Sequence, residues 1–461
     1  MTIKHTHRFI ARFRVEAETP LFVGSGEASL LTDALVQKDV NGFPMILGTS
    51  LAGVLRHAFG DNASELFGDS NAKENAQASK IKISNAYFVL PNGNVSEGIL
   101  DNIDETILNR FNNLPKRQHV RITEKGTAEK HGLFDNEVVY KGTQFVFELE
   151  TRGTIEDKEN WGKVLDLIKA PTFRIGGGTR NGFGKLKVKE IVEKTFDLNV
   201  LDDFNAYLNL NPSFNVQNNS LENHNNTAII NTNSNFVSYK LNLKPDLFFV
   251  FSEGFGDDDV DNKPIEEEVL IYNNGEIKFE KQSLIPATSI KGAISHRIAF
   301  HYNKLTNAFA GQDVNSPKVA EENEAVYNLF GKAGEKADTS QAGRVYLNDM
   351  YYSEAEIENN KIFNHVAIDR FTGGALSGAL FSEKVSRLKS DEFNLEIHVE
   401  KTALEVNEIQ QAFKNTLLDI CKGLLPLGGM TTKGNGMFTG VLSIDGKEEF
   451  NYLNQTKECQ A

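Results

Sequence analysis

The chain has very few cysteines and no membrane-spanning segment. Among 461 residues there are two cysteines, Cys421 and Cys459, which alone cannot form a disulfide framework or a zinc site. No apolar run approaches the roughly 18 residues needed to cross a bilayer. The N-terminal residues Met1–His5 lead into a strand pattern and show no signal-peptide core. We therefore expect a globular cytoplasmic protein that does not contact a membrane.

Positive charge is also scarce. The 49 Lys and Arg residues stand against 63 Asp and Glu residues, for a net charge of −14. This balance argues against a general nucleic-acid coat, because phosphate binding needs a positive field. One stretch differs: between Leu114 and His131, five basic residues stand against two acidic ones. That stretch is either a solvated loop or a local basic groove.

Several chemical signatures are missing from the sequence. No glycine-rich loop continues into the Gly-Lys-Ser/Thr step of a phosphate-binding P-loop, and no HExxH motif occurs. The calcium-binding loop of an EF-hand is also missing. No Ser/His/Asp or Cys/His arrangement suggests a nucleophile with its base. The sequence therefore offers none of these common routes to catalysis.

The most informative pattern is a duplication. Four landmarks of the first half recur in the same order in the second half, and the two glycine-rich loops keep one offset of 252 residues throughout. The landmarks are a Thr-Ser step (Thr49–Arg56 and Thr288–Ile294), a Leu-Phe-Gly step (66–68 and 329–331), a His-Val segment (119–138 and 365–385) and the glycine-rich loops (Gly176–Gly184 and Gly428–Gly436). Conserved order and spacing predict two copies of one domain.

Each copy is expected to contain a strand, a helix, a run of strands, a second helix and a last strand. This order predicts α+β domains of the ferredoxin-like class, unless the middle strands form a separate subdomain. Ser50 and Ser289 are placed as helix N-caps. The expected helices are 51–59, 158–168, 290–302 and 405–422, and the expected strands after the first of each half are 80–88, 138–150, 185–192, 344–352, 392–400 and 437–444.

The halves are joined by a polar stretch. Residues 205–235 are dense in Asn and Ser, which favours a linker or a surface loop. The polar tail is expected to be frayed. The sequence thus predicts a first domain over 1–197, a linker over 198–236, a second domain over 237–450 and a tail over 451–461.

The helix starts and the glycine-rich loops are candidate anion sites. A helix N-terminus offers free N–H groups and partial positive charge, although a simple cap needs no ligand. Glycine density lets a backbone approach closely and offers N–H groups to anions, although a tight turn explains it equally. Arg180, Lys185 and Lys433 in or beside these loops favour contact with a nucleic-acid backbone.

One loop aspartate is a candidate for catalysis. Asp33 precedes a short strand, and a carboxylate beside a nucleic-acid groove can hold a divalent cation or take a proton from a ribose hydroxyl. Most loop aspartates, however, have no chemical role. Counting back nine residues from the Asn-Gly turns makes Glu266 the formal counterpart of Asp33. Because the second loop is longer, further candidates remain: Asp257, Asp258, Asp259 and Asp261.

Taken together, these motifs resemble the RAMP superfamily, specifically the backbone subunits of type III CRISPR effector complexes. The resemblance implies a tandem fusion of two RRM-like or ferredoxin-like domains, each with an inserted β-thumb, at Gln118–Glu137 and Asn364–Val385. The similarity is carried by Thr19–Gly26, Asp33, Phe43–Arg56 and Gly176–Gly184 in the first half, and by Ile285–Gly292, Val366–Ala375, Leu380-Phe381 and Gly428–Gly436 in the second.

The resemblance also implies a function. Such subunits line up along a CRISPR RNA, present it to a complementary target RNA and assemble with other type III effector subunits. In members that cut, an aspartate in the loop after the first strand cleaves target RNA with a divalent metal, Mg²⁺ or Mn²⁺, and Asp33 is at that place. The implied RNA-binding residues are Ser50, Arg56, Lys116, Arg117, His119, Arg121, Gly177, Gly178, Arg180, Ser289, Lys291, Arg297, Arg370, Gly429 and Lys433.

Two alternatives to a subunit that cleaves target RNA stay open. The chain is either an endoribonuclease within the assembled complex or a scaffold that binds RNA while another subunit cuts. A third possibility is a nuclease that processes precursor RNA, for which the chain has no convincing His/Tyr/Lys trio.

Overall fold

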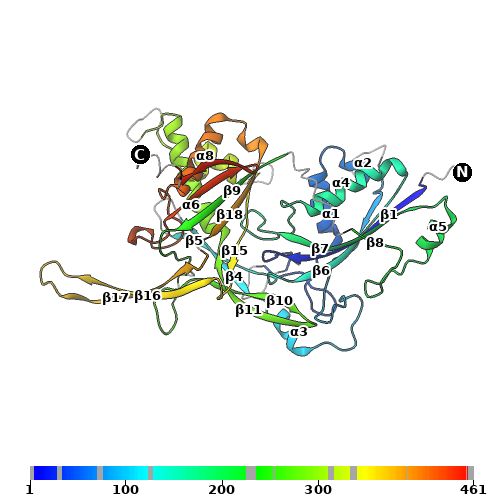
Figure 1. The fold of residues 1–461 in the computed structure, drawn as a ribbon, viewed down its shortest axis with the longest axis horizontal. Helices are drawn as coiled ribbons and strands as arrows, with labels where there is room; N and C mark the ends of the chain where they lie inside the picture. The colour runs from blue at the N-terminus through cyan, green and yellow to red at the C-terminus, as the bar shows by residue number, and fades with distance from the viewer. Residues whose placement is uncertain are drawn as a thin grey trace.

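The computed structural model describes residues 5–27, 34–69, 76–122, 128–224, 235–252, 254, 256–309, 316–332, 340–390, 392–452 and 454. They form a mixed α/β fold of two halves that lie side by side (Figure 1). None of the described helices is long and apolar enough to cross a membrane.

The first half is built on an antiparallel sheet with the strand order β2-β6-β1-β7-β8. Alternate residues of a strand point to opposite faces, so Phe9, Phe13 and Val15 all lie on one buried face of β1. The strands of this sheet are β1 (His7–Ala17), β2 (Ile81–Ile83), β3 (Tyr87–Phe88), β6 (Gln144–Gly153), β7 (Leu186–Asp197) and β8 (Glu222–Asn223). β3 also pairs with β6.

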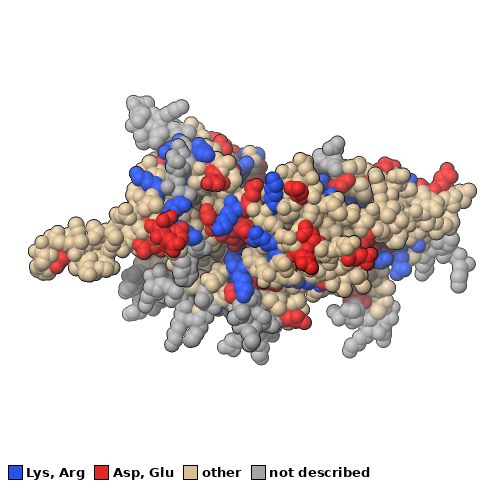
Figure 2. Space-filling view, turned by 90° about the horizontal axis from the view of Figure 1, so that it is seen from below, with Lys and Arg blue, Asp and Glu red and all other residues tan. Residues whose placement is uncertain are grey.

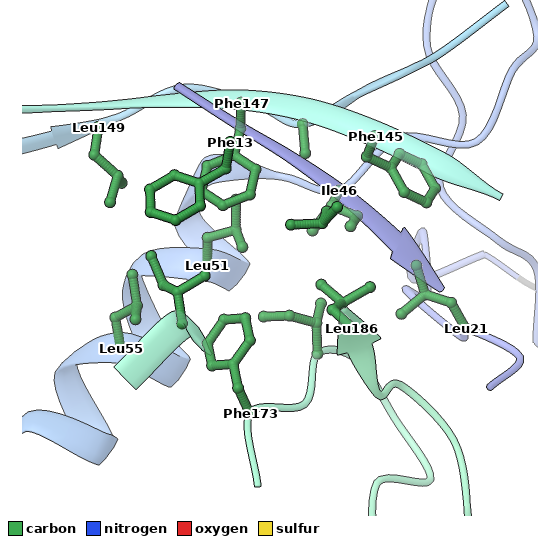
Figure 3. Packing of buried hydrophobic residues seen from close by; sticks show 14 of the residues in the cluster. Phe13, Leu21, Ile46, Leu51, Leu55, Phe145, Phe147, Leu149, Phe173 and Leu186 are labelled. Carbon is green, nitrogen blue, oxygen red and sulfur yellow. The ribbon is translucent and has the colours of Figure 1, made fainter. Parts of the chain in front are cut away.

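Two helices, α1 (Gly48–Phe59) and α4 (Lys158–Lys169), cover that face (Figure 3). Phe13 and Phe147 stack on adjacent strands with ring centroids 5.2 Å apart, and Leu51 and Leu55 of α1 pack beneath them. The helical spacing of Leu51, Leu55 and Phe59 gives α1 one apolar side. The shorter helices of this half are α2 (Ala63–Phe67) and α3 (Glu105–Asn112).

The second half repeats this arrangement. Its sheet has the order β14-β18-β9-β19-β20, and α6 (Ala287–Leu305) and α8 (Asn407–Cys421) pack together on it. The strands of each main sheet and the two helices packed on it follow the predicted order of strand, helix, strands, helix and strand, but in the second half an additional hairpin over 266–285 precedes the first helix. The other elements are β9 (Phe236–Pro245), α7 (Glu324–Phe330), β12 (Gly331–Lys332), β13 (Gln341–Ala342), β14 (Val345–Leu347), β18 (Phe393–Glu400), β19 (Phe438–Ile444) and β20 (Lys447–Asn451).

Three hairpins extend from the sheets. The first is β4 (Lys116–Ile122) with β5 (Ala128–Glu137), and the second is β16 (Ile357–Ile368) with β17 (Ala375–Leu388), which projects from the body (Figure 1). These two hairpins occupy the segments predicted as thumbs.

The third hairpin, β10 (Glu266–Asn273) with β11 (Glu276–Ile285), pairs with β15 (Met350–Tyr352) and joins the halves. Leu270 of β10 packs in the core of the first half and donates its N–H to the carbonyl of Lys141 (2.8 Å). The second half therefore contributes a residue to the core of the first.

The helix starts differ from the prediction. α1 begins at Gly48 and α6 at Ala287, so Ser50 and Ser289 lie inside the first turn and are not N-caps. The residues that precede these helices make no side-chain cap either. The serine pattern therefore located each helix within three residues but assigned the wrong capping group.

The caps come from elsewhere in the chain. The N–H of Gly48 donates to Oδ1 of Asn85 (2.8 Å), and the N–H of Ala287 donates to Oδ1 of Asp349 (2.8 Å). The strands predicted over 80–88 and 344–352 are each broken into two short strands at these residues. The strand predicted over 138–150 begins only at Gln144, because a turn at Lys141-Gly142 precedes it.

Part of the predicted linker is folded onto the first sheet. It contains α5 (Leu201–Leu208), and Leu221 packs in a small cluster with Ile10 and Phe196 on the sheet face opposite the helices. Arg12 anchors the same segment by donating to the carbonyls of Asn211 (2.6 Å) and Ser213 (2.9 Å). The rest of the predicted loop, 225–234, and tail residues 453 and 455–461 lie outside the described residues.

Candidate nucleic-acid interface

A groove with a volume of about 1340 Å³ lies between the halves. The first hairpin forms one wall, the first turns of α6 form another, and the loop at Gly428-Gly429 closes it. Basic Lys116, Lys291 and His296 share its lining with acidic Glu266, Glu267 and Glu321. Figure 2 likewise shows basic and acidic side chains close together over the middle of the molecule.

His119 and Phe134 form a flat aromatic surface on the hairpin wall. Their rings stack with centroids 5.0 Å apart and 19° between the ring planes, and the rings of His119 and Phe183 lie edge to face with centroids 5.7 Å apart. Burial lowers the pKa of His119, and the neighbouring Arg117 lowers it further. The imidazole is therefore biased toward its neutral form, which suits stacking against a base.

The tip of α6 offers a contact for an anion. Ser289 is exposed in the first turn and lines the groove. Lys291 follows, but its Nζ already donates to Oδ1 of Asn181 (3.2 Å) and the carbonyl of Arg180 (3.4 Å). Burial and the charge of Arg180 lower the pKa of Lys291. The ammonium group is thus held in the wall of the groove.

Arg117 is committed to the contact between the halves. Only 6% of the residue is exposed, and it donates to Oε1 of Glu267 (2.6 Å), to Asp349 and to the hydroxyl of Tyr351 (3.0 Å). Burial alone lowers the pKa of Arg117, but the carboxylates of Asp349 and Glu267 outweigh burial and hold it well above its usual value. Its charge is therefore balanced inside the protein.

The first glycine-rich loop also packs against the second half. Arg180 donates to the carbonyl of Gly343 (3.0 Å) and stacks on the ring of Tyr346 at 4.4 Å. A Cβ added at Gly182 would lie 2.4 Å from Oδ1 of Asp349. The absence of a side chain at Gly182 therefore allows this close approach. Gly177 and Gly178 remain exposed.

Replacing Gly182 by alanine should open the contact between the halves. Gly182 has φ +101°, and its new methyl group would meet the buried Asp349 and the Cβ of Ala287. We expect the free energy needed to open the junction to fall by about 2–4 kcal/mol, measured by hydrogen exchange at the amide of Ala287. Gly434→Ala is the matched control, because Gly434 has φ +94° but nothing within 4 Å. Equal losses in both variants would show that backbone strain alone is responsible.

Among the second-half candidates, Ser289, Lys291 and Gly429 line this groove, whereas Arg297, Arg370 and Lys433 are not part of its lining. Lys433 sits over the ring of Phe381 at 4.9 Å, and His365 stacks on the same ring at 6.2 Å. Arg370 is exposed at the tip of the second hairpin. Arg297 pairs with Asp419 of α8 (2.6 Å). These residues do not converge on one surface with Lys116 and His119.

Two further first-half candidates also lie outside the groove lining. Ser50 lies in the first turn of α1 and Arg56 is exposed near its end. The side chain of Arg121 lies outside the described residues.

Asp33 lies outside the described residues, but its neighbours identify its counterpart. The carbonyl of Ala34 accepts an N–H from the end of β5 (3.2 Å), and the carbonyl of Asn262 accepts one from β17 (2.8 Å). These equivalent contacts align Ala34 with Asn262, so Asp261 is the residue that matches Asp33. The structural register thus differs from the count that led to Glu266, because the additional residues of the second loop follow this point.

Asp261 is held at the base of the second hairpin. Its Oδ2 accepts hydrogen bonds from the N–H (2.8 Å) and hydroxyl (2.9 Å) of Ser382, which lower the pKa of the carboxyl group. Asp257 instead accepts the N–H groups of its own turn, at Asp259 and Val260. Asp258 and Glu266 are exposed, and Glu266 lines the groove.

A complete metal cage is absent from the described part of the chain, where no three His, Cys, Asp or Glu side chains converge on a possible ion. Asp261 offers a single carboxylate. Mg²⁺ is often held by one or two carboxylates together with phosphate oxygens and water. The single carboxylate of Asp261 therefore does not make a preformed protein site for such an ion.

Sequence reasoning missed Asp349, Tyr346 and Glu267, which organise the junction. For Asp349 the sequence carried an indirect signal: Asp349 and Asn85 each lie two residues after a matched short strand.

Comparison with known proteins identifies the family. A model of the RAMP superfamily matches residues 14–187 and 276–439, more than half of the chain. The chain therefore belongs to the RAMP superfamily and carries two RAMP regions, which confirms the resemblance carried by the duplicated motifs. A chain of the solved structure described as "Type III-B Cmr-beta Cryo-EM structure of the Apo state" is similar, with a TM-score of 0.32 and 17% identity, over 39% of this chain and 96% of that chain. No curated protein matches the chain.

Proposed function

We propose that the chain is a backbone subunit of a type III CRISPR effector complex that acts in the cytoplasm. In this proposal, two ferredoxin-like RAMP domains hold a CRISPR RNA and present it to a complementary target RNA. The first and second hairpins act as the β-thumbs of these domains. The observation that carries the proposal is the groove between the halves, in which a hairpin with stacked rings faces a helix N-terminus.

The groove supplies the contacts that a single RNA strand needs. The partial positive charge at the start of α6, near exposed Ser289, favours a phosphate group, and exposed Lys116 on the hairpin wall adds positive charge. The His119–Phe134 pair offers a surface on which a base can stack. Because these contacts are local, they are compatible with a net charge of −14.

Cleavage of the target RNA would use Asp33 and its counterpart Asp261. Each carboxylate would take the proton from a ribose 2′-hydroxyl, whose oxygen then attacks the adjacent phosphate, while the 5′ oxygen leaves and takes a proton from water. A bound Mg²⁺ or Mn²⁺ would supply charge stabilisation at the phosphate. The role of the carboxylates is thus to hold the reacting hydroxyl and accept its proton.

The second hairpin supports contacts with other effector subunits. It exposes apolar side chains, with exposed fractions of 60% at Ile368, 99% at Phe371 and 71% at Leu380. The projection carries few charged side chains on the face shown in Figure 2. An apolar surface of this kind is typical of a protein interface.

One observation favours the alternative of a scaffold without catalysis. Both hydrogen bonds from Ser382 occupy the same carboxylate oxygen of Asp261, which restrains the group and makes it a weaker base. In that case the second half would bind RNA without cutting it.

Replacing His119 by alanine should weaken binding of a CRISPR RNA about 5- to 150-fold, the range expected for loss of one base–aromatic stack. The measurement is fluorescence anisotropy with a labelled RNA that carries a repeat-derived 5′ end. His224→Ala is the control, because His224 lies at the edge of the first sheet, beyond the groove lining. Equal affinity of His119→Ala and the unaltered protein would refute the proposed groove.

A further inference from the structure

The contact between the halves is made by two surfaces that can be defined by residues. The projecting surface of the first half consists of Arg117, Arg174 and Arg180. The receiving surface of the second half consists of Tyr346 and Asp349. Arg117 pairs with Asp349, and both other arginines stack on Tyr346, at 5.4 and 4.4 Å.

The duplication places different residues on the receiving surface of the first half. Asn85 takes the place of Asp349, because each side chain accepts the first N–H of the matched helix. Lys82 takes the place of Tyr346, because each is the middle residue of the matched strand, β2 or β14. This surface therefore carries a cation and a neutral amide where the other carries a phenol and a carboxylate.

The projecting surface of the second half is also different. Phe363 takes the place of Arg117, because each lies two residues before a histidine that is paired with a phenylalanine of the facing strand. At the constant offset of 252 residues between the glycine-rich loops, Arg174 corresponds to Pro426 and Arg180 to Thr432. The second half thus has none of the three arginines.

We propose that these positions encode which surfaces pair. The receiving surface of the second half selects an arginine-bearing projecting surface, and the receiving surface of the first half selects a protein surface without those arginines. An arginine docked against Lys82 and Asn85 would lie beside another cation, and the amide of Asn85 offers no negative charge in the place of the Asp349 carboxylate. This inference goes beyond the proposed function, since it concerns recognition between protein surfaces and needs no RNA.

The first test uses the full chain without RNA. Asp349→Asn should speed hydrogen exchange at Ala287 and along β4 at least tenfold, because Arg117 loses a buried carboxylate. The helix start itself tolerates this change, since Asn85 performs the same capping role in the first half. The matched control Asn85→Asp should leave exchange at the junction unchanged. Equal acceleration by both variants would overturn the proposal.

A double-mutant cycle tests whether the pair itself is recognised. Arg117→Phe alone should speed exchange at Ala287 at least tenfold. Arg117→Phe with Asp349→Asn, which together reproduce the residues of the other surfaces, should exchange more slowly than Arg117→Phe alone. Additive effects would overturn the proposal. Exchange at Phe13 and Phe147 should stay constant in every variant, which separates opening of the junction from unfolding of the first half.

Exchanging the two receiving surfaces tests selection directly. In Asp349→Asn/Tyr346→Lys the arginine-bearing surface has no partner. Adding Asn85→Asp and Lys82→Tyr creates a matching receiving surface on the first half. The arginine-bearing surface of another copy of the chain can then dock on it. Light scattering should then show a molecular mass that rises with protein concentration in the fourfold variant and not in the double variant. No difference between the two would overturn the proposal.

Discussion

Replacing both Asp33 and Asp261 by alanine is expected to abolish cleavage of a target RNA by the assembled complex. Each single replacement should remove one of two cuts and leave the other unchanged. Loss of a general base typically slows a reaction about 10²- to 10⁴-fold, so each missing cut should be evident on a denaturing gel. The measurement uses end-labelled target RNA complementary to the bound CRISPR RNA, in the presence of Mg²⁺.

The controls for this prediction come from the same acidic loop. Asp258→Ala removes an exposed carboxylate that has no counterpart in the first half, and it should leave both cuts intact. If Asp261→Ala also leaves both cuts intact, the second half is a scaffold. If the double variant still cuts at both positions, neither carboxylate has the proposed role, although RNA binding in the groove would be untouched by that result.

Replacing Arg117 by alanine is expected to destabilise the junction between the halves by about 3–5 kcal/mol. The change leaves Asp349, which is 5% exposed, and Glu267 without their shared cation. The measurement is the free energy of opening obtained from hydrogen exchange at Ala287, whose N–H donates to Asp349. Arg370→Ala is the control, because that exposed arginine should change stability by no more than about 0.5 kcal/mol.

The Arg117→Ala variant should recover part of its stability at low pH. Burial raises the pKa of Asp349, and Arg117 opposes that rise in the unaltered protein. Without Arg117 the folded state favours the protonated carboxyl group more strongly than the unfolded state does. Stability should therefore increase as the pH falls through the raised pKa of Asp349. A difference in stability between the variant and the unaltered protein that stays constant from pH 7 to pH 5 would contradict this explanation.

The place of the two hairpins followed from the resemblance to the RAMP superfamily, whereas the duplication and the order of elements could be predicted from the sequence patterns themselves. These features rest on periods and spacings that are local in the chain: alternation along β1, the helical spacing of Leu51 and Leu55, and a constant offset between the glycine-rich loops. α4 and α8 begin and end within two residues of the predicted bounds for the same reason. Local patterns also located Lys116 and His119, which both line the groove.

The partners of these residues depend on how distant segments pack together. Asp349 caps a helix that begins 62 residues earlier and pairs with an arginine 232 residues away, so no local pattern predicts either contact. The same folding places Arg117 and Arg180 in the junction between the halves and gives Asn262, which follows Asp261, the same contact as Ala34, which follows Asp33 in the sequence. Charge and glycine content establish what a segment is able to bind. The packing of distant segments determines whether its groups remain available or are already balanced by a buried neighbour.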